Sequence, residues 1–312
     1  MDEQMTPRFD LHSHSVYSDG SNTPAQSIEE AARLGLAGLA ITDHDSLTQL
    51  SDVRRAAREA DFPVLAGTEV SSWNPETGRK VHILAFGLEA TPDGSGPLEL
   101  MLAETLRART ANTLWQAWVI WRAMHAGDDP ASSLAASGCA DPGRVDAFFS
   151  PDAACRVAGV STGVYKQHVM EALLHLPYTD SAYGPIYRSL FKGEGIACHD
   201  ISYPSAVDAV RAVREQGGVP VLAHPGQMDS WSAIPGLVEA GLMGIEAHHP
   251  DHGGPDVEAA REAAEAHGLF VTGGSDYHGR YGAPRRLGCC FVDASEAGDA
   301  VAQLFERERS LS

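Results

Sequence analysis

The segment Phe9-Asp10-Leu11-His12-Ser13-His14 places two histidines at the end of a short, mainly apolar run. The run over residues 9–12 predicts a β-strand, and residues two apart on a strand point to the same face. The imidazoles of His12 and His14 would therefore face one side of a sheet, where they could hold a metal ion. By itself this pattern is weak evidence, because a histidine is more often solvent-facing or hydrogen-bonded than a metal ligand.

Short β-like runs alternate with helical segments on both sides of the middle of the chain. The predicted strands are residues 9–12, 38–42, 63–70, 80–87, 219–223, 244–247 and 270–274. The predicted helices are residues 24–34, 47–60, 205–216, 234–240 and 255–267. This repetition predicts an α/β fold with a parallel sheet, either open or closed into a barrel.

The alternation stops between residues 91 and 201, where a long helical run over residues 99–124 is followed by shorter helical pieces. We interpret this stretch as a helical subdomain inserted into the α/β domain. The predicted organisation is a discontinuous domain over residues 8–90 and 202–295, an inserted helical subdomain over residues 91–201 that caps the substrate, and a C-terminal helix over residues 296–312.

Metal-ligating side chains recur at or near the ends of the predicted strands, except that His82 lies at the start of its apolar run. They are His12, His14, Asp19, His44, Glu69, His82, His224, Glu246, Asp276 and His278. The carboxyl ends of parallel strands meet at one edge of a sheet or barrel, so these residues are expected to converge there. Imidazole and carboxylate together suit Zn, Mn or Fe, and a carboxylate can bridge two ions. The repetition makes independent coincidence improbable.

Composition and the absence of other motifs limit the classes of partner, location and activity that the sequence allows. The 312 residues carry a formal net charge of −19, which disfavours a nucleic-acid duplex as partner but allows a small anionic substrate at a cluster of cations. We find no apolar run long enough to span a membrane and no signal peptide, and therefore expect a cytoplasmic protein. The chain also has no G-x-S-x-G elbow, phosphate-binding P-loop or dinucleotide-binding glycine motif.

The motifs that carry the site also resemble a known family. They are, in order, Asp10-Leu11-His12-Ser13-His14, Ser18-Asp19-Gly20, Thr42-Asp43-His44-Asp45, Gly67-Thr68-Glu69, His82-Ile83-Leu84, Ala223-His224-Pro225, Gly244-Ile245-Glu246 and Ser275-Asp276-Tyr277-His278. Together they are similar to the polymerase and histidinol phosphatase (PHP) family of metalloenzymes. The resemblance implies a distorted (β/α)7 TIM-like barrel that holds two or three divalent ions (Mn, Fe or Zn).

The resemblance also implies how the ligands divide. One metal would take His12, His14, Glu69 and Asp276, a second would share Glu69 and add His82 and His224, and a third would take Asp19, His44 and His278. Of these, Asp19, His44, Glu69 and Asp276 are expected to serve the reaction itself. The implied activity is phosphoester hydrolysis, in which a metal-bound hydroxide attacks phosphorus.

Substrate recognition departs from the family pattern. Lys166 stands where many relatives have an arginine two residues before His168, and Lys192 is offset from a usual lysine. His252 matches a position near the substrate in relatives. We predict that these four residues bind a small phosphorylated, nucleotide-like substrate. The alternatives are amide or ester hydrolysis by the same metals, and a metal-binding module without activity; the sequence leaves the oligomeric state open.

Overall fold

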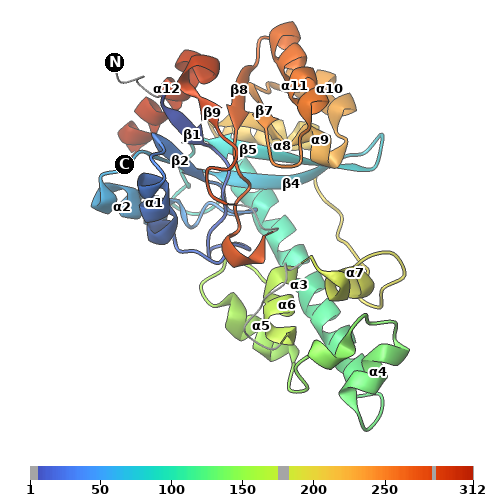
Figure 1. Ribbon diagram of the computed structural model, residues 1–312. Helices are drawn as coiled ribbons and strands as arrows, with labels where there is room; N and C mark the ends of the chain where they lie inside the picture. The colour runs from blue at the N-terminus through green and yellow to red at the C-terminus, as the bar shows by residue number, and fades with distance from the viewer. Residues whose placement is uncertain (1–5, 175–182, 283–285, 312) are drawn as a thin grey trace.

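The computed structural model describes residues 6–174, 183–282 and 286–311. Figure 1 shows an upper lobe of strands and helices and a lower lobe that contains helices α4 to α7. The strands are β1 (Arg8–Asp10), β2 (Gly38–Ile41), β3 (Val64–Ala66), β4 (Thr68–Asn74), β5 (Arg79–Phe86), β6 (Val219–Ala223), β7 (Gly244–His248), β8 (Phe270–Gly273) and β9 (Val292–Asp293).

The helices of the upper lobe follow the predicted ranges closely. They are α1 (Pro24–Arg33), α2 (Leu50–Ala60), α8 (Ala206–Glu215), α9 (Pro225–Met228), α10 (Ile234–Ala240), α11 (Gly254–His267) and α12 (Ala294–Leu311). The remaining α-helices are α3 (Pro97–Met124), α4 (Pro130–Ala136), α5 (Pro151–Ala158), α6 (Lys166–Leu173) and α7 (Pro185–Phe191). Three short 3₁₀ turns are η1 (Pro142–Arg144), η2 (Trp231–Ala233) and η3 (Gly279–Tyr281) among the described residues.

The sheets mix parallel and antiparallel pairs. One sheet has the order β3-β2-β1-β9 and the other the order β4-β5-β6-β7-β8. Strand β5 runs antiparallel to both β4 and β6, so the expectation of a uniformly parallel sheet is wrong there. The reason is the four-residue connection between β4 and β5, which is long enough for a hairpin but too short for the crossover that a parallel pair needs.

The antiparallel direction of β5 decides where His82 lies. His82 stands in the first half of its strand, opposite Ser71 of β4 and Ala223 of β6. Because β5 runs the other way, its beginning lies at the edge where β6 ends. The sequence places His82 at the start of its apolar run, and the antiparallel pairing explains how it reaches the same edge as the other candidate ligands.

Glycine 67 interrupts the strand predicted over residues 63–70. The structure has β3 before it and β4 after it, and a Cβ atom at Gly67 would lie 2.6 Å from the carbonyl oxygen of Ala85. Only glycine allows this approach. The amide of Gly67 donates to the carbonyl of Ile41 (2.9 Å), and the amide of Leu11 donates to Gly273 (2.9 Å), so hydrogen bonds join the two sheets at two places.

Alternate strand residues enter two apolar cores. On β5, Ile83 packs with the core beneath helices such as α1, α2 and α8, whereas Leu84 and Phe86 pack with Val301 and Phe305 of α12. This two-residue period is typical of a sheet covered on both faces. Within α12, Gly298 has a left-handed φ of 61° that breaks the helix into two parts.

A third core fills the lower lobe, and helix α3 connects it to the upper one. Leu98 and Leu102 of α3 pack in the upper core, while Ile120 and Met124 pack in the lower one. The helix has 28 residues, which corresponds to about 42 Å. Figure 1 shows α3 running from beneath the sheets into the lower lobe.

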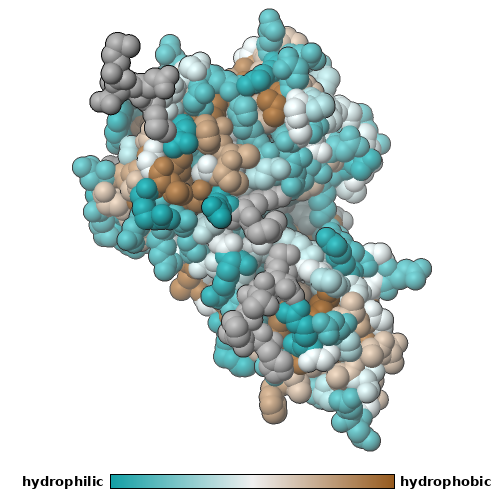
Figure 2. Space-filling model, in the orientation of Figure 1, coloured by the Kyte–Doolittle hydropathy of each residue, from teal (hydrophilic) through white to brown (hydrophobic). Residues whose placement is uncertain are grey.

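The surface agrees with this division of the apolar residues. On the face drawn in Figure 2, hydrophilic residues predominate on both lobes and hydrophobic residues form small patches. Within the described ranges, no helix combines the length and apolar character needed to cross a membrane.

Candidate metal centre and substrate pocket

The structure brings all nine predicted ligands together in three overlapping groups. In each group the ligand atoms lie within 4.8 Å of one another. The first metal group is His12, His14, Glu69 and Asp276; the second is Glu69, His82 and His224; the third is His14, Asp19, His44 and His278. All of these side chains are buried except His82, which is half-buried. Such burial separates the groups from the acidic clusters that occur on solvated surfaces.

The first metal group gathers around two carboxylate oxygens. The Nε2 atoms of His12 and His14 are 3.3 Å apart and lie 3.2 and 3.1 Å from Oε2 of Glu69. Oδ1 of Asp276 lies 3.6 and 3.3 Å from the same nitrogens. Four donors thus point at one small volume, as ligands of a single cation do.

Glu69 reaches two groups with its two oxygens. Its Oε2 faces the first metal group, while Oε1 lies 2.7 Å from Nδ1 of His82 and 2.9 Å from Nε2 of His224. This arrangement is typical of a carboxylate that bridges two metal ions. The short β3–β4 break at Gly67 sets the start of β4, and with it the position of Glu69.

The third metal group centres on Asp19. Its Oδ1 lies 3.4 Å from Nε2 of His278 and 3.7 Å from Nδ1 of His14, and its Oδ2 lies 3.9 Å from Nε2 of His44. His14 faces the first metal group with Nε2 and the third with Nδ1. A neutral imidazole keeps one N–H and has one lone pair, so His14 can serve one group at a time.

The histidines and carboxylates of the cluster shift one another's pKa values. Burial by itself would lower the pKa of His12, but Glu69 and Glu246 outweigh it and hold the pKa well above its usual value. Burial would likewise raise the pKa of Glu69, yet the surrounding histidines, His44 first, hold it well below its usual range. Glu69 is thus ionised, and without a metal ion the protonated form of His12 supplies positive charge beside it.

Two buried nitrogens support the fit to metal ions. Nδ1 of His14 and Nδ1 of His44 make no hydrogen bond, although they lie 3.7 and 3.3 Å from oxygens of Asp19 and Glu69. A buried polar atom without a hydrogen bond is destabilising. A cation beside either nitrogen would remove that cost, although His14 can give only one of its two nitrogens to a cation at a time, so the residues present fit divalent metals.

Two further aspartates fix the loops that carry the ligands. Asp43 accepts hydrogen bonds from the amide and hydroxyl of Ser15 (2.8 and 2.7 Å), next to His14. Asp10 does the same for Ser275 (2.9 and 2.6 Å), next to Asp276. Burial raises the pKa of Asp10 to about 6 despite these bonds. Each aspartate thus joins one ligand loop to the strand beside it.

Glu246 was predicted from its place on a strand as a candidate ligand, but it lies behind His12. Its Oε1 is 3.2 Å from Nδ1 of His12, the nitrogen that faces away from the first metal group, and its Oε2 accepts from the amide of His224 at 2.8 Å. A carboxylate on the far nitrogen of a ligating histidine fixes the ring and its tautomer. Glu246 therefore orients ligands.

The sequence analysis missed His249. This buried residue follows β7, with Nε2 3.4 Å from Oδ2 of Asp276 and its ring centre 5.0 Å from that of His224. The signal was present, since His249 directly follows His248 at the end of a predicted strand, but the two adjacent histidines gave no way to choose the inward-facing one.

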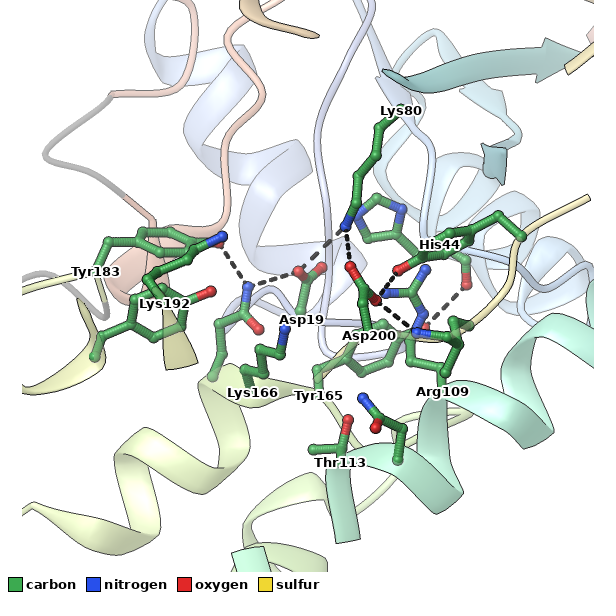
Figure 3. Close-up of a pocket in the computed structure, with 15 residues that line it drawn as sticks. Asp19, His44, Lys80, Arg109, Thr113, Tyr165, Lys166, Tyr183, Lys192 and Asp200 are labelled. Atoms are coloured by element: carbon green, nitrogen blue, oxygen red, sulfur yellow. Dashed lines mark hydrogen bonds and ion pairs between the residues drawn. The ribbon is translucent and has the colours of Figure 1, made fainter. Parts of the chain in front are cut away.

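A polar pocket opens beside the third metal group (Figure 3). Its lining residues are Asp19, His44, Lys80, Arg109, Asn112, Thr113, Tyr165, Lys166, Gln167, Tyr183, Tyr187, Lys192, Asp200, Ile201 and Tyr203. A second cavity, over the metal groups, shares Asp19, His44, Tyr183 and Lys192 with it. The two cavities thus meet at the third metal group, and we call the first one the cationic pocket.

Two of the four predicted substrate residues line the cationic pocket. Lys166 begins helix α6, and Lys192 directly follows helix α7; their ammonium groups lie 5.9 Å from the ring centres of Phe191 and Tyr187, respectively. Burial lowers the pKa of Lys166 to about 8, although Asp200 opposes the shift. Both lysines point into the space drawn in Figure 3.

The other two lie outside the lining of both cavities. His168 is buried, and its Nδ1 accepts from the amide of Tyr165 (3.2 Å) at the start of α6. His252 accepts from the amide of Gly226 (3.0 Å) with Nε2 and contacts the carbonyl of Ala247 (2.8 Å) with Nδ1. Both rings thus make hydrogen bonds to the backbone, and their contact with substrate stays a prediction.

The sequence analysis also missed the remaining cations of the pocket. Arg109 from α3 donates to Asp45 at 2.7 Å, and Lys80 from β5 donates to Asp200 at 2.6 Å. These partners are 64 and 120 positions apart in the chain. A strand-end pattern carries no signal for such pairs, because they come from a helix face, a hairpin and a loop.

Comparisons with known proteins agree with this geometry. The family model described as PHP domain matches residues 10–108. The chain is 44% identical over 279 residues to the phosphoribosyl 1,2-cyclic phosphate 1,2-diphosphodiesterase of Eggerthella lenta, covering 89% of this chain and 97% of that protein. It is 32% identical over 282 residues to the 3',5'-nucleoside bisphosphate phosphatase of Chromobacterium violaceum, covering 86% of this chain and 87% of that protein.

Solved structures show the same fold. A candidate metal-dependent phosphoesterase from Bifidobacterium adolescentis superposes with a TM-score of 0.74 at 27% identity, over 96% of each chain. An amidohydrolase from Chromobacterium violaceum, solved with bound sulfate and no metal, superposes with a TM-score of 0.73 at 26% identity, again over 96% of each chain. The mixed α/β fold is thus shared along nearly the whole length.

Proposed function

The chain belongs to the PHP family and is a metal-dependent phosphoesterase, and on this premise we propose that its substrate is a small sugar or nucleotide phosphate that carries two phosphate groups. One phosphate would lie at the metal groups and be hydrolysed, while the other would lie in the cationic pocket. The observation that carries the proposal is the junction of the two cavities beside Asp19. The two named relatives act on phosphorylated ribose and on nucleoside bisphosphates, which supports it.

Charge in the cationic pocket favours a second phosphate. Arg109 is paired with Asp45, and Lys80 is paired with Asp200, so these charges are largely neutralised. Lys166 and Lys192 instead lie beside aromatic rings. Two ammonium groups match the charge of a phosphomonoester, which is close to −2 at pH 7.

At the reacting phosphate, the chain would supply the ligands of the metal ions and the residues that orient those ligands. His12, His14, Glu69 and Asp276 would hold one divalent ion, and the other two metal groups one each; Mn, Fe and Zn all suit imidazole with carboxylate. Such ions lower the pKa of water and stabilise charge on phosphoryl oxygens. Glu246 and His249 would keep the ligands in place, and the burial of the centre excludes bulk water.

The domain organisation forms part of the same proposal. Residues 8–90 and 202–295 would close into a distorted (β/α)7 barrel, which is supported by the hydrogen bonds that join the two sheets through Gly273 and Gly67. Residues 91–201 would cap the substrate, which is supported by the separate apolar core of the lower lobe. Residues 175–182 and 283–285 of these ranges, and Ser312 of the predicted C-terminal helix, lie outside the described residues.

A substrate panel tests the proposal. The Mn-loaded protein is assayed for phosphate release with phosphoribosyl cyclic phosphate, 3',5'-nucleoside bisphosphates and the matching nucleoside monophosphates. We expect kcat/KM to be at least about 10- to 100-fold higher for substrates with two phosphates, because even one charge-assisted contact contributes about 1.5–3 kcal/mol. EDTA should abolish every activity. Equal kcat/KM for the monophosphates would refute the role of the second phosphate.

Amide or ester hydrolysis remains the second candidate, since one structural relative bears the name amidohydrolase. The lysines of the cationic pocket disfavour it, because a neutral amide substrate gives them no partner. The same panel distinguishes the two functions if it includes N-acyl and carboxylic ester substrates, which should stay at background.

A further inference from the structure

The three metal groups differ in what holds their ligands. In the first and second groups, the contacts come from the upper lobe: Glu246 bonds His12 and the amide of His224, and His249 contacts Asp276. The third metal group is different, because each of the loops that carry Asp19, His44 and His278 is bonded to the inserted residues 91–201.

The loop that carries Asp19 has the most such bonds. Nε2 of Gln167, in α6, donates to Oδ2 of Asp19 at 2.8 Å. The hydroxyl of Ser161 donates to the carbonyl of Ser18 at 2.8 Å, and the amide of Thr162 donates to the carbonyl of Tyr17 at 2.9 Å. Bonds to both the carboxylate and the backbone fix where the Asp19 oxygens point.

The loop after His44 is held from two helices of the insert. The phenol of Tyr165 donates to the carbonyl of His44 at 3.1 Å. Arg109 of α3 donates to Oδ2 of Asp45 and to the hydroxyl of Ser71, both at 2.7 Å. Asp45 has a left-handed φ of 53°, which is costly for a residue other than glycine, so these bonds also stabilise an uncommon backbone conformation.

The loop after His278 is held by an ion pair. Arg280, in η3, pairs with the carboxylate of Glu171, which lies on α6 and is buried. Nε of Arg280 donates to the second oxygen of Glu171 at 3.2 Å. Because two nitrogens of the guanidinium bind the two carboxylate oxygens, this pair fixes both the distance and the orientation of Arg280 relative to Glu171. The same short helix α6 therefore contacts two of the three loops.

We propose that the inserted residues are required to form the third metal group and not the other two, and that Gln167 is the positioning residue that holds Asp19 there. The inference rests on the proposed metal centre. The amide of Gln167 donates its second hydrogen to the hydroxyl of Tyr183 at 2.8 Å, and both residues line the cationic pocket. Gln167 therefore adjoins both the third metal group and the cationic pocket.

The test is a count of metal ions in substrate-free protein. Wild type, Gln167→Met and Gln116→Met are titrated with Mn²⁺ by equilibrium dialysis, and bound metal is measured by elemental analysis. Gln116 is the matched control, because it is a fully buried glutamine of the same lobe whose Nε2 donates to two carbonyls, of Ala197 at 2.7 Å and of His199 at 2.9 Å, away from the ligand loops. Thermal unfolding of each variant checks that the lobe is folded.

We expect three ions in wild type and in Gln116→Met. Gln167→Met should bind two with unchanged affinity and the third about 10- to 100-fold more weakly, as loss of a hydrogen bond to a ligand typically does. The proposal would be overturned if Gln167→Met bound the third ion with an affinity within twofold of wild type. It would also be overturned if Gln116→Met lost as much affinity for the third ion as Gln167→Met, or if wild type bound only two ions. These outcomes do not depend on which phosphoester is hydrolysed, which the substrate panel decides separately.

Discussion

The metal groups and the cationic pocket meet at Asp19 but are built in different ways. The metal ligands are mostly buried and come from short motifs beside strands, where backbone hydrogen bonds set each position. The pocket cations come from a hairpin (Lys80), two helices (Arg109 and Lys166) and the residue after α7 (Lys192), and Lys80 remains 43% exposed. In our proposal, the ligands at the sheet edge serve the reaction, whereas the inserted residues together with Lys80 select the substrate.

The largest effect is expected from a change of Glu69, the carboxylate that we propose bridges two metal ions. Glu69→Gln keeps the size of the side chain but removes the charge that faces His12, His14, His82 and His224. We expect kcat to fall by about 10³-fold or more and metal content to drop, because both ions lose a ligand charge. Steady-state kinetics and elemental analysis measure the two effects.

Glu76→Gln is the control for that variant, since Glu76 is an exposed residue in the turn after β4. It should match wild type in both measurements. If Glu69→Gln kept wild-type activity, the assignment of Glu69 as a bridging ligand would be wrong.

A smaller effect is expected in the pocket. Lys166→Gln removes an ammonium group from the cationic pocket, and we expect KM to rise about 10- to 100-fold for substrates with two phosphates while kcat changes little. Monophosphates should be affected less than threefold, which serves as the internal control. A fall in kcat with unchanged KM would instead place Lys166 with the reacting phosphate and blur the division between the two regions.

The pH dependence of KM tests the same role of Lys166 as a contact of the second phosphate. Burial lowers the pKa of Lys166 to about 8, so its side chain is charged below pH 8 and loses its proton as the pH rises through 8. The second pKa of a phosphomonoester is near 6, so its charge no longer changes there. We expect KM to rise about tenfold from pH 7 to pH 9 in wild type. Lys166→Arg should remove this rise, because guanidinium stays charged; a rise that persists in Lys166→Arg would exclude Lys166 as its cause.

The smallest effect is expected at Lys80. Its ammonium is already paired with Asp200, and both side chains are 43% exposed, so the pair contributes about 0–1 kcal/mol to stability. Lys80→Gln should leave the free energy of urea unfolding within about 1 kcal/mol and raise KM less than fivefold. A larger KM effect than that of Lys166→Gln would mean that Lys80, on the sheet side, makes the main phosphate contact.

Much of the metal centre could be predicted from the sequence. His224 and Asp276 come directly after or near strands, and local hydrophobic patterns reveal strands well. Glu246 and His249 could not be assigned, because the direction in which each side chain points depends on the strand pairing around it. Lys166 and Lys192 were found through family resemblance, whereas Arg109 and Asp200 needed the packing of α3 and the loop before α8 against the sheets.

By itself, the sequence determined which chemistry is available: imidazole and carboxylate at the ends of strands, in an order that matches the PHP family. Those signals are local, since a strand and the loop after it are encoded by neighbouring residues. Only the tertiary structure decided that His82 reaches the cluster through an antiparallel strand and that Gln167 bonds to Asp19. These facts depend on contacts between residues far apart in the chain, which no short stretch of sequence specifies.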